Sequence, residues 1–201
     1  RTLIKAIKND IAIYAIHTNL DNVMEGVNKM MAQKMGIKEG RILQTKSGLL
    51  KKLICFCPAD KADVVRNALF SAGAGKIGNY ENCSFNSDGK GTFKGNEQTN
   101  PYVGIKGQLH IEAEVKIETI YPAHLEAHIL TSLMMAHPYE EVAYDIIPLD
   151  NFWAKVGAGY IGNLEEALSE KDFLAHLKKV FGCGSIRHTA LKGEKIKKVA
   201  L

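Results

Sequence analysis

The sequence has no long hydrophobic run: none of its apolar stretches approaches the ~20 residues that a membrane-spanning helix needs. Its first residues do not have the pattern of a secretory signal peptide, so we expect none, although Arg1 is not an initiator methionine. Its basic residues are scattered and form no stripe with interleaved aromatic residues, so we do not expect nucleic acid as a partner. These absences favour a cytoplasmic globular protein without membrane contact.

Cysteine is scarce. The chain of 201 residues contains four, Cys55, Cys57, Cys83 and Cys183. They lack the second C-x-x-C or the histidine pair of a zinc finger. Cys55 and Cys57 are two positions apart in a strand-like apolar pattern, so they point to the same face. We expect reduced and mostly buried thiols, as is usual in the cytoplasm.

Residues 11–28, IAIYAIHTNLDNVMEGVN, are the stretch around which the rest of the chain is organised. The apolar run at residues 11–16 predicts a strand covered on both faces. Polar side chains follow at once, namely those of His17, Thr18, Asn19 and Asp21. Sites form at the carboxyl ends of strands in open α/β sheets, so these residues are a candidate site. The alternative is that Asp21 or Asn22 only caps the next helix.

Three motifs, in this order, resemble the Nif-three-like family, whose members are also described as GTP cyclohydrolase 1 type 2 homologues. They are H-T-N-L-D at residues 17–21, H-P-Y-E-E-V-A-Y-D at 137–145 and G-x-G-x-I-G at 157–162. The resemblance implies a dinuclear metal centre with Asp21 as a ligand and two divalent ions, Zn, Fe or Mn, per full-length subunit. It also implies a homo-oligomer, either a trimer or a hexamer.

Both ends of the sequence are typical of an internal fragment. Residues 1–8 have the helical spacing of a helix tail, and residues 195–201 form a strand pattern with no turn after it. The family resemblance implies a His-His-Pro segment before this region and a His…Glu pair after it. Neither is present here, so we expect the partner ligands of Asp21 to lie outside these residues.

The expected fold class is α/β and α+β: a partial Nif-three-like α/β layer interrupted by a ferredoxin-like β-α-β-β-α-β inserted domain. Residues 1–48 begin the α/β metal-site domain, residues 49–150 form the insert, and residues 151–201 continue the first domain. Strands of the insert are expected at residues 49–57, 80–91, 110–121 and 142–149. The hairpin tip is expected at residues 87–91, and the Gly-punctuated residues 36–48 are expected to cross between domains.

In the last segment, residues 160–164 and the pair 185–190 and 195–201 are expected to be strands. Ser169 and Asp172 form a capping pattern for a helix that ends at Gly182. The glycines at residues 157–162 resemble a dinucleotide fingerprint, but that fingerprint opens a helix after a strand, whereas a strand is expected here. Nucleotide binding by this segment is therefore not expected.

A second candidate cluster comprises His137, Tyr139, Glu140 and Glu141. Pro138 ends the preceding helix, and His137 and Glu140 could meet at a cleft as an acid–base pair or as metal-type ligands. The alternative is that His137 caps the helix end, where a cation is favoured, while the glutamates face solvent.

Two functions follow from these patterns. The first is a metal-dependent hydrolase acting on a nucleotide, in which a metal centre activates water. The alternative is a non-enzymatic regulatory protein whose insert senses a metal or small metabolite, gates a cavity, or serves only assembly of the oligomer.

Overall fold

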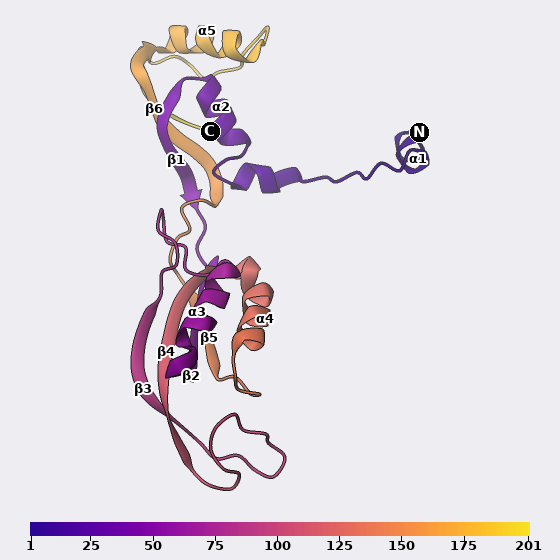
Figure 1. Ribbon diagram of the computed structural model, residues 1–201. Helices are drawn as coiled ribbons and strands as arrows, with labels where there is room; N and C mark the ends of the chain where they lie inside the picture. Colours follow the sequence, from indigo (N-terminus) through magenta and orange to yellow (C-terminus); the bar gives the residue numbers. More distant parts are fainter. The chain divides into compact units, whose positions relative to one another are not determined.

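The computed structural model describes residues 1–201, which form two compact units (Figure 1). The first consists of Arg1–Lys46 and Trp153–Leu201, and the second of Ser47–Phe152. The fold is mixed α/β, with one antiparallel sheet in each unit. None of its helices combines the length and the apolar character that a membrane crossing needs.

The first unit contains a three-stranded antiparallel sheet of order β1-β6-β7. Its strands are β1 (Ile37–Thr45), β6 (Gly157–Ser169) and β7 (Lys195–Ala200). The helices of this unit are α1 (Thr2–Lys8), α2 (Val27–Lys34) and α5 (Glu170–Phe181), with the short 3-10 helix η1 (His17–Asn22) before α2. The core of the unit is formed by Ala32, Met35, Ile37, Tyr160, Leu164 and Phe173.

Helix α5 forms where its capping residues predict it. The Ser169 hydroxyl accepts a hydrogen bond from the Asp172 backbone N–H, which satisfies one of the free amides of the first turn. The helix ends at Gly182, whose φ of 63° is the left-handed conformation that glycine adopts without strain. The expectation of a helix between these residues is confirmed.

The expectation of a strand at residues 11–16 is wrong. This segment pairs with no strand, and its apolar side chains are exposed, as the 60% exposed Ile13 and the 81% exposed Tyr14 illustrate. A strand requires a hydrogen-bonding neighbour, and none lies beside this segment in the described chain. A run of β-branched residues therefore shows only that a segment could pair as a strand, and no other strand of this chain pairs with residues 11–16.

One further expectation for the first unit holds only in part, and another is wrong. The chain does pass from the first unit to the second within residues 36–48, between Lys46 and Ser47, but most of this range is strand β1 and not a loop. In β1, Gly40 leaves room for a ring, because a Cβ there would lie 2.0 Å from the Tyr160 side chain. Residues 185–190 are not a strand, and β7 pairs instead with β6, which covers and extends the strand expected at residues 160–164.

The second unit contains a four-stranded antiparallel sheet of order β3-β4-β2-β5. Its strands are β2 (Leu50–Pro58), β3 (Phe85–Phe93), β4 (His110–Pro122) and β5 (Tyr144–Leu149). Its helices are α3 (Ala62–Ser71) and α4 (Glu126–Ala136), each preceded by a 3-10 turn, η2 (Ala59–Lys61) and η3 (Ala123–Leu125). Buried side chains from both layers form one core, including Leu53, Cys55, Val65, Leu69, Ile117 and Ile129.

The hairpin tip expected at residues 87–91 is wrong. Strand β3 runs straight through these residues and pairs in register with β4, with Gly89 opposite Glu114 and Gly91 opposite Glu112. Residues 94–109 make the connection to β4 instead. The strand expected at residues 110–121 is confirmed as β4. Its apolar and polar residues alternate, which buries Val115, Ile117 and Thr119 on one face, but Ile111 on the same face is 59% exposed because the pairing of β4 with β2 ends at Glu114.

Candidate functional site

The H-T-N-L-D segment folds as η1, and Asp21 does not cap the following helix. The N-cap of α2 is Gly26, with no side-chain hydrogen bond. The Asp21 side chain is exposed, and its carboxylate makes no hydrogen bond or ion pair with the rest of the chain. The capping alternative is therefore wrong for Asp21, and its carboxylate is free to bind another group.

The backbone around Asp21 is fixed on three sides. The Asn28 amide Nδ2 donates to the Asp21 carbonyl oxygen at 2.8 Å. Gly26 packs so closely on the turn that a Cβ would lie 1.8 Å from the Leu20 carbonyl oxygen. Beyond η1, the Met24 N–H donates to the Lys155 carbonyl oxygen at 2.9 Å. The carboxylate thus projects from a held backbone, which favours a ligand role.

The other three residues of this candidate site are also exposed. His17 has a φ of 42° and forms no hydrogen bond with Asp21, so it does not orient that carboxylate within this chain. The Thr18 carbonyl oxygen accepts from Asn22 Nδ2 at 2.8 Å, and the Asn19 N–H donates to the Ile16 carbonyl oxygen at 3.2 Å. The turn is therefore held by backbone groups of Thr18 and Asn19.

A metal centre needs several donors, and these residues do not supply them by themselves. No group of three or more His, Cys, Asp or Glu side chains in the chain is placed to hold a metal ion. Asp21 is a single hard oxygen donor of the kind that divalent cations accept. The donors of this chain therefore do not by themselves complete a two-metal centre.

His137 is the buried C-cap residue of α4, and both of its ring nitrogens are occupied. The Tyr139 backbone N–H donates to Nδ1 at 3.1 Å, so Nε2 carries the proton that is donated to the Phe56 carbonyl oxygen at 2.9 Å. Burial lowers the pKa of His137, which keeps the ring neutral. His137 therefore serves structure: it neither pairs with Glu140 nor offers a metal a free nitrogen.

Tyr139 is the centre of the second cluster. Its hydroxyl donates to Glu114 Oε1 at 2.9 Å, and its ring lies 5.9 Å from that of Phe93 and 6.3 Å from that of Tyr102, measured between centroids. Burial, followed by the bond to Glu114, raises the pKa of Tyr139, so the hydroxyl remains a donor at neutral pH. Tyr139 thereby links the segment after α4 to strand β4.

The two glutamates of the motif differ in role. Glu140 is exposed, and its Oε1 accepts a hydrogen bond from the Asn100 backbone N–H at 2.7 Å, which ties the 94–109 connection to the segment after α4. Glu141 is exposed and makes no hydrogen bond or ion pair.

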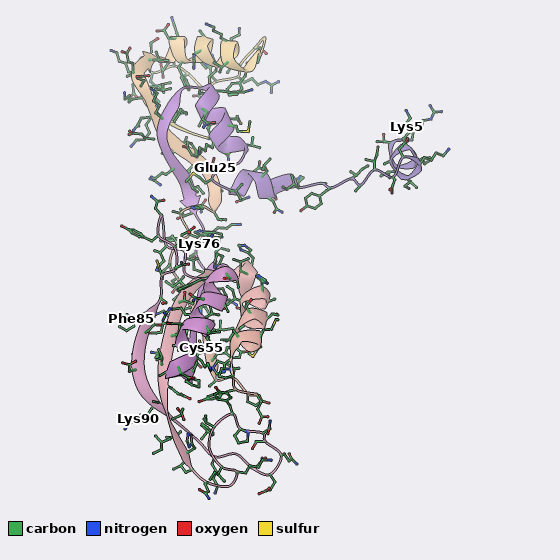
Figure 2. All side chains as sticks on the ribbon, viewed as in Figure 1. Lys5, Glu25, Cys55, Lys76, Phe85 and Lys90 are labelled. Carbon is green, nitrogen blue, oxygen red and sulfur yellow. The ribbon has the colours of Figure 1, made fainter.

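Tyr139, Glu140 and Glu141, but not His137, line a cavity of about 600 Å³ within the second unit. It lies along the half of β3 that carries Lys90, toward the opposite end of the strand from Phe85 (Figure 2). Its walls include Phe56, Gly91, Phe93, Tyr102, Glu114 and Tyr139. A volume of this size is typical of small-molecule sites.

Glu114, Gly91 and the aromatic partners of Tyr139 were not expected from the sequence as parts of a site. Glu114 sits in an alternating strand pattern, where a charged residue is usually read as solvent-facing. The available signal was the pair of glycines at 89 and 91, because glycine inside a strand marks close approach of another group.

Comparison with known proteins gives a consistent match over the whole chain. The sequence model of the family described as Duf34/NIF3 (NGG1p interacting factor 3) matches residues 1–201. A protein of Halalkalibacterium halodurans named GTP cyclohydrolase 1 type 2 homolog is 44% identical over 202 residues, covering 100% of this chain and 54% of its own length. A Bacillus subtilis protein of the same name is 38% identical, with the same coverage.

The crystal structure of a Bacillus cereus protein related to NIF3 superposes with a TM-score of 0.84 at 43% identity. This match covers 98% of this chain and 52% of that one. The chain spans about half the length of the curated relatives it matches.

Proposed function

Because the chain belongs to the Duf34/NIF3 family, we propose that it is part of a metal-dependent hydrolase of the GTP cyclohydrolase 1 type 2 kind. Asp21 supplies one carboxylate ligand to its dinuclear metal centre. The names of the relatives at 44% and 38% identity support the reaction class. The observation that carries the role of Asp21 is its exposed carboxylate, free of intramolecular bonds on a held backbone.

The remaining ligands of this centre come from outside these 201 residues. Two observations support this assignment of the ligands. No group of three or more His, Cys, Asp or Glu side chains in the chain is placed to hold a metal ion, and the chain covers 54% of the length of the relatives. Two divalent ions per full-length subunit, Zn, Fe or Mn, would polarise a bound oxygen and lower the pKa of water. His17, Thr18 and Asn19 lie in the same turn and are its nearest candidates for substrate contact.

We further infer that Ser47–Phe152 is a ferredoxin-like domain inserted into a partial α/β layer. The element order β2-α3-β3-β4-α4-β5 and the sheet order β3-β4-β2-β5 support this assignment. Strands β3 and β5 each leave one edge unpaired, which supports assembly into a trimer or hexamer through sheet edges. Four free cysteines support a cytoplasmic location.

The test uses the whole protein that contains this chain. It is assayed for turnover of GTP with Zn²⁺, Fe²⁺ or Mn²⁺, with Asp21→Asn as the variant and Asp10→Asn as the matched control. Asp10 is an exposed aspartate with a φ of 53°, a conformation that asparagine tolerates, so its substitution preserves the fold. We expect turnover to be lost in the first variant and kept in the second. Equal activity in both variants would remove Asp21 from the mechanism.

A further inference from the structure

We propose that the cavity of Ser47–Phe152 binds a small organic cation, an amine, amidinium or guanidinium carried on a flat or apolar body, with Glu114 as its anchor. This site lies in the second unit and uses no residue of the H-T-N-L-D turn. It is therefore independent of the proposed role of Asp21.

Glu114 places a partly buried carboxylate on the cavity wall. Glu114 and Lys116 are the only charged residues of the cavity wall that are partly buried; the others are exposed. The Tyr139 hydroxyl holds Glu114 Oε1 at 2.9 Å, while Oε2 accepts no hydrogen bond from the chain. A carboxylate acceptor held by one oxygen and open at the other suits a cationic N–H donor, which forms shorter and stronger bonds than a neutral one.

The glycines of β3 make room for this carboxylate. A Cβ at Gly91 would lie 2.1 Å from Glu114 Oε2, so the carboxylate occupies space that any other residue would fill. At Gly89 the nearest atom to such a Cβ is the Glu114 carbonyl oxygen at 4.0 Å. The absence of a side chain at Gly91 is therefore what allows the Glu114 carboxylate to lie there, whereas the position of this carboxylate does not depend on Gly89.

The lysines of the wall do not cancel this negative charge. Lys116 is paired with Glu118, with Nζ and Oε1 3.4 Å apart. Lys90 and Lys94 are exposed, so water screens their charges. The unpaired charge of the cavity that water screens least is thus the carboxylate of Glu114, so the cavity should bind a cation more tightly than an anion.

Four aromatic rings also line the wall and select the body of the ligand. Phe93, Tyr102 and Tyr139 form a continuous ring cluster, and Phe56 lies on the wall as well. Aromatic surfaces bind flat apolar groups and attract cations through their quadrupoles.

Three probes of equal size and shape separate charge from shape: benzamidine is cationic, benzamide is neutral and benzoate is anionic. Each is titrated into the full chain, and backbone amide shifts are followed by ¹H–¹⁵N NMR. We expect benzamidine to shift amides of residues 87–95 and 137–141, with a Kd on the order of 1 mM. Benzamide and benzoate are expected to bind at least about tenfold more weakly, as loss of a charge-assisted bond requires.

Variants assign the effect to Glu114. Glu114→Gln preserves shape and is expected to weaken benzamidine binding at least about tenfold. Glu112→Gln is the control, because Glu112 lies on the same face of β4 but bonds to His110 at 2.7 Å and does not line the cavity. It should leave the affinity unchanged, as should Asp21→Asn.

Three results overturn the proposal: no shift of cavity amides with benzamidine at its solubility limit, binding of benzoate or benzamide as tight as that of benzamidine, or unchanged affinity in Glu114→Gln. Because Asp21 plays no part in these measurements, their failure leaves the hydrolase proposal standing. Loss of activity in Asp21→Asn likewise says nothing about the cavity.

Discussion

The Tyr139 hydroxyl donates to the Glu114 carboxylate across 25 residues of sequence, with 2.9 Å between the oxygens. This bond joins the segment that follows α4 to strand β4. It also fixes the one partly buried carboxylate of the cavity while leaving its second oxygen available. The stability of the second unit and the placement of the negative charge in its cavity therefore both depend on the bond between Tyr139 and Glu114.

Removing the hydroxyl tests this pair. Tyr139→Phe leaves the ring and its aromatic contacts but deletes a bond to a charged acceptor, so the free energy of unfolding should fall by about 1–2 kcal/mol. Urea denaturation measures the change. Tyr80→Phe is the control, because Tyr80 is 76% exposed and its hydroxyl forms no bond; an equal loss in both variants would contradict the role of Tyr139.

The two glycines of β3 should respond differently to a methyl group. Gly91→Ala places its Cβ against the Glu114 carboxylate, a flexible group that can move away, so the fold should survive while benzamidine binding weakens at least about tenfold. Gly89 also lines the cavity, but a Cβ there meets nothing nearer than the Glu114 carbonyl oxygen at 4.0 Å, so Gly89→Ala should leave the carboxylate in place and weaken binding less than Gly91→Ala does. Titrations of both variants by NMR compare them, and equal affinities would show that Gly91 does not place the carboxylate.

The four thiols should fall into two reactivity classes. Burial raises the pKa of Cys55 to about 12 and that of Cys57 to about 11, so neither is a thiolate at neutral pH, whereas Cys83 and Cys183 are partly exposed. Iodoacetamide should label only Cys83 and Cys183 in the native protein and all four in urea, as read by mass spectrometry. Prompt native labelling of Cys57 would be inconsistent with the buried core of β2.

His137 should make the second unit sensitive to acid. Burial lowers the pKa of His137 in the folded state, whereas in the unfolded chain this pKa is near the ordinary value of 6.5. At a pH between these two pKa values the unfolded chain therefore binds more protons than the folded chain. The stabilisation is fully present above pH 6.5 and is lost as the pH falls through the lower, folded pKa. Thermal unfolding of wild type and His137→Gln across this range measures it: the variant should lose part of the acid dependence, and an unchanged slope would exclude His137 as its source.

Local signals were sufficient where structure is set by neighbours in the sequence. The Ser169 cap and the Gly182 terminus define α5, and the alternation of β4 defines its buried face. Local signals failed where a glycine makes room for a side chain that is distant in the sequence. Gly40 was interpreted as part of a loop, although it makes room for the Tyr160 ring beside β1. Gly91 was interpreted as part of a turn, although it makes room for the Glu114 carboxylate.

The candidate sites were predictable to different degrees. Asp21 was chosen as a candidate from its motif, and its role as a metal ligand stays a prediction. Whether it capped α2 depended on backbone geometry, which places Gly26 at that position. In the second cluster Tyr139 was named as a candidate, while its partner Glu114 was missed. Gly91 indicates that some group approaches β3 closely, but which side chain does so depends on how β3 pairs with β4 and how the segment after α4 meets that strand. Pairing between distant segments is the information that a single sequence does not contain.

The role of Asp21 is tested most directly by the metal content of the purified protein that contains this chain, measured by inductively coupled plasma mass spectrometry. Wild type and Asp10→Asn are expected to retain bound divalent metal after dialysis. Asp21→Asn should bind it at least about tenfold more weakly, because losing a direct ligand costs more than losing an outer hydrogen-bond partner. Equal metal content in all three proteins would contradict the assignment of Asp21 as a metal ligand.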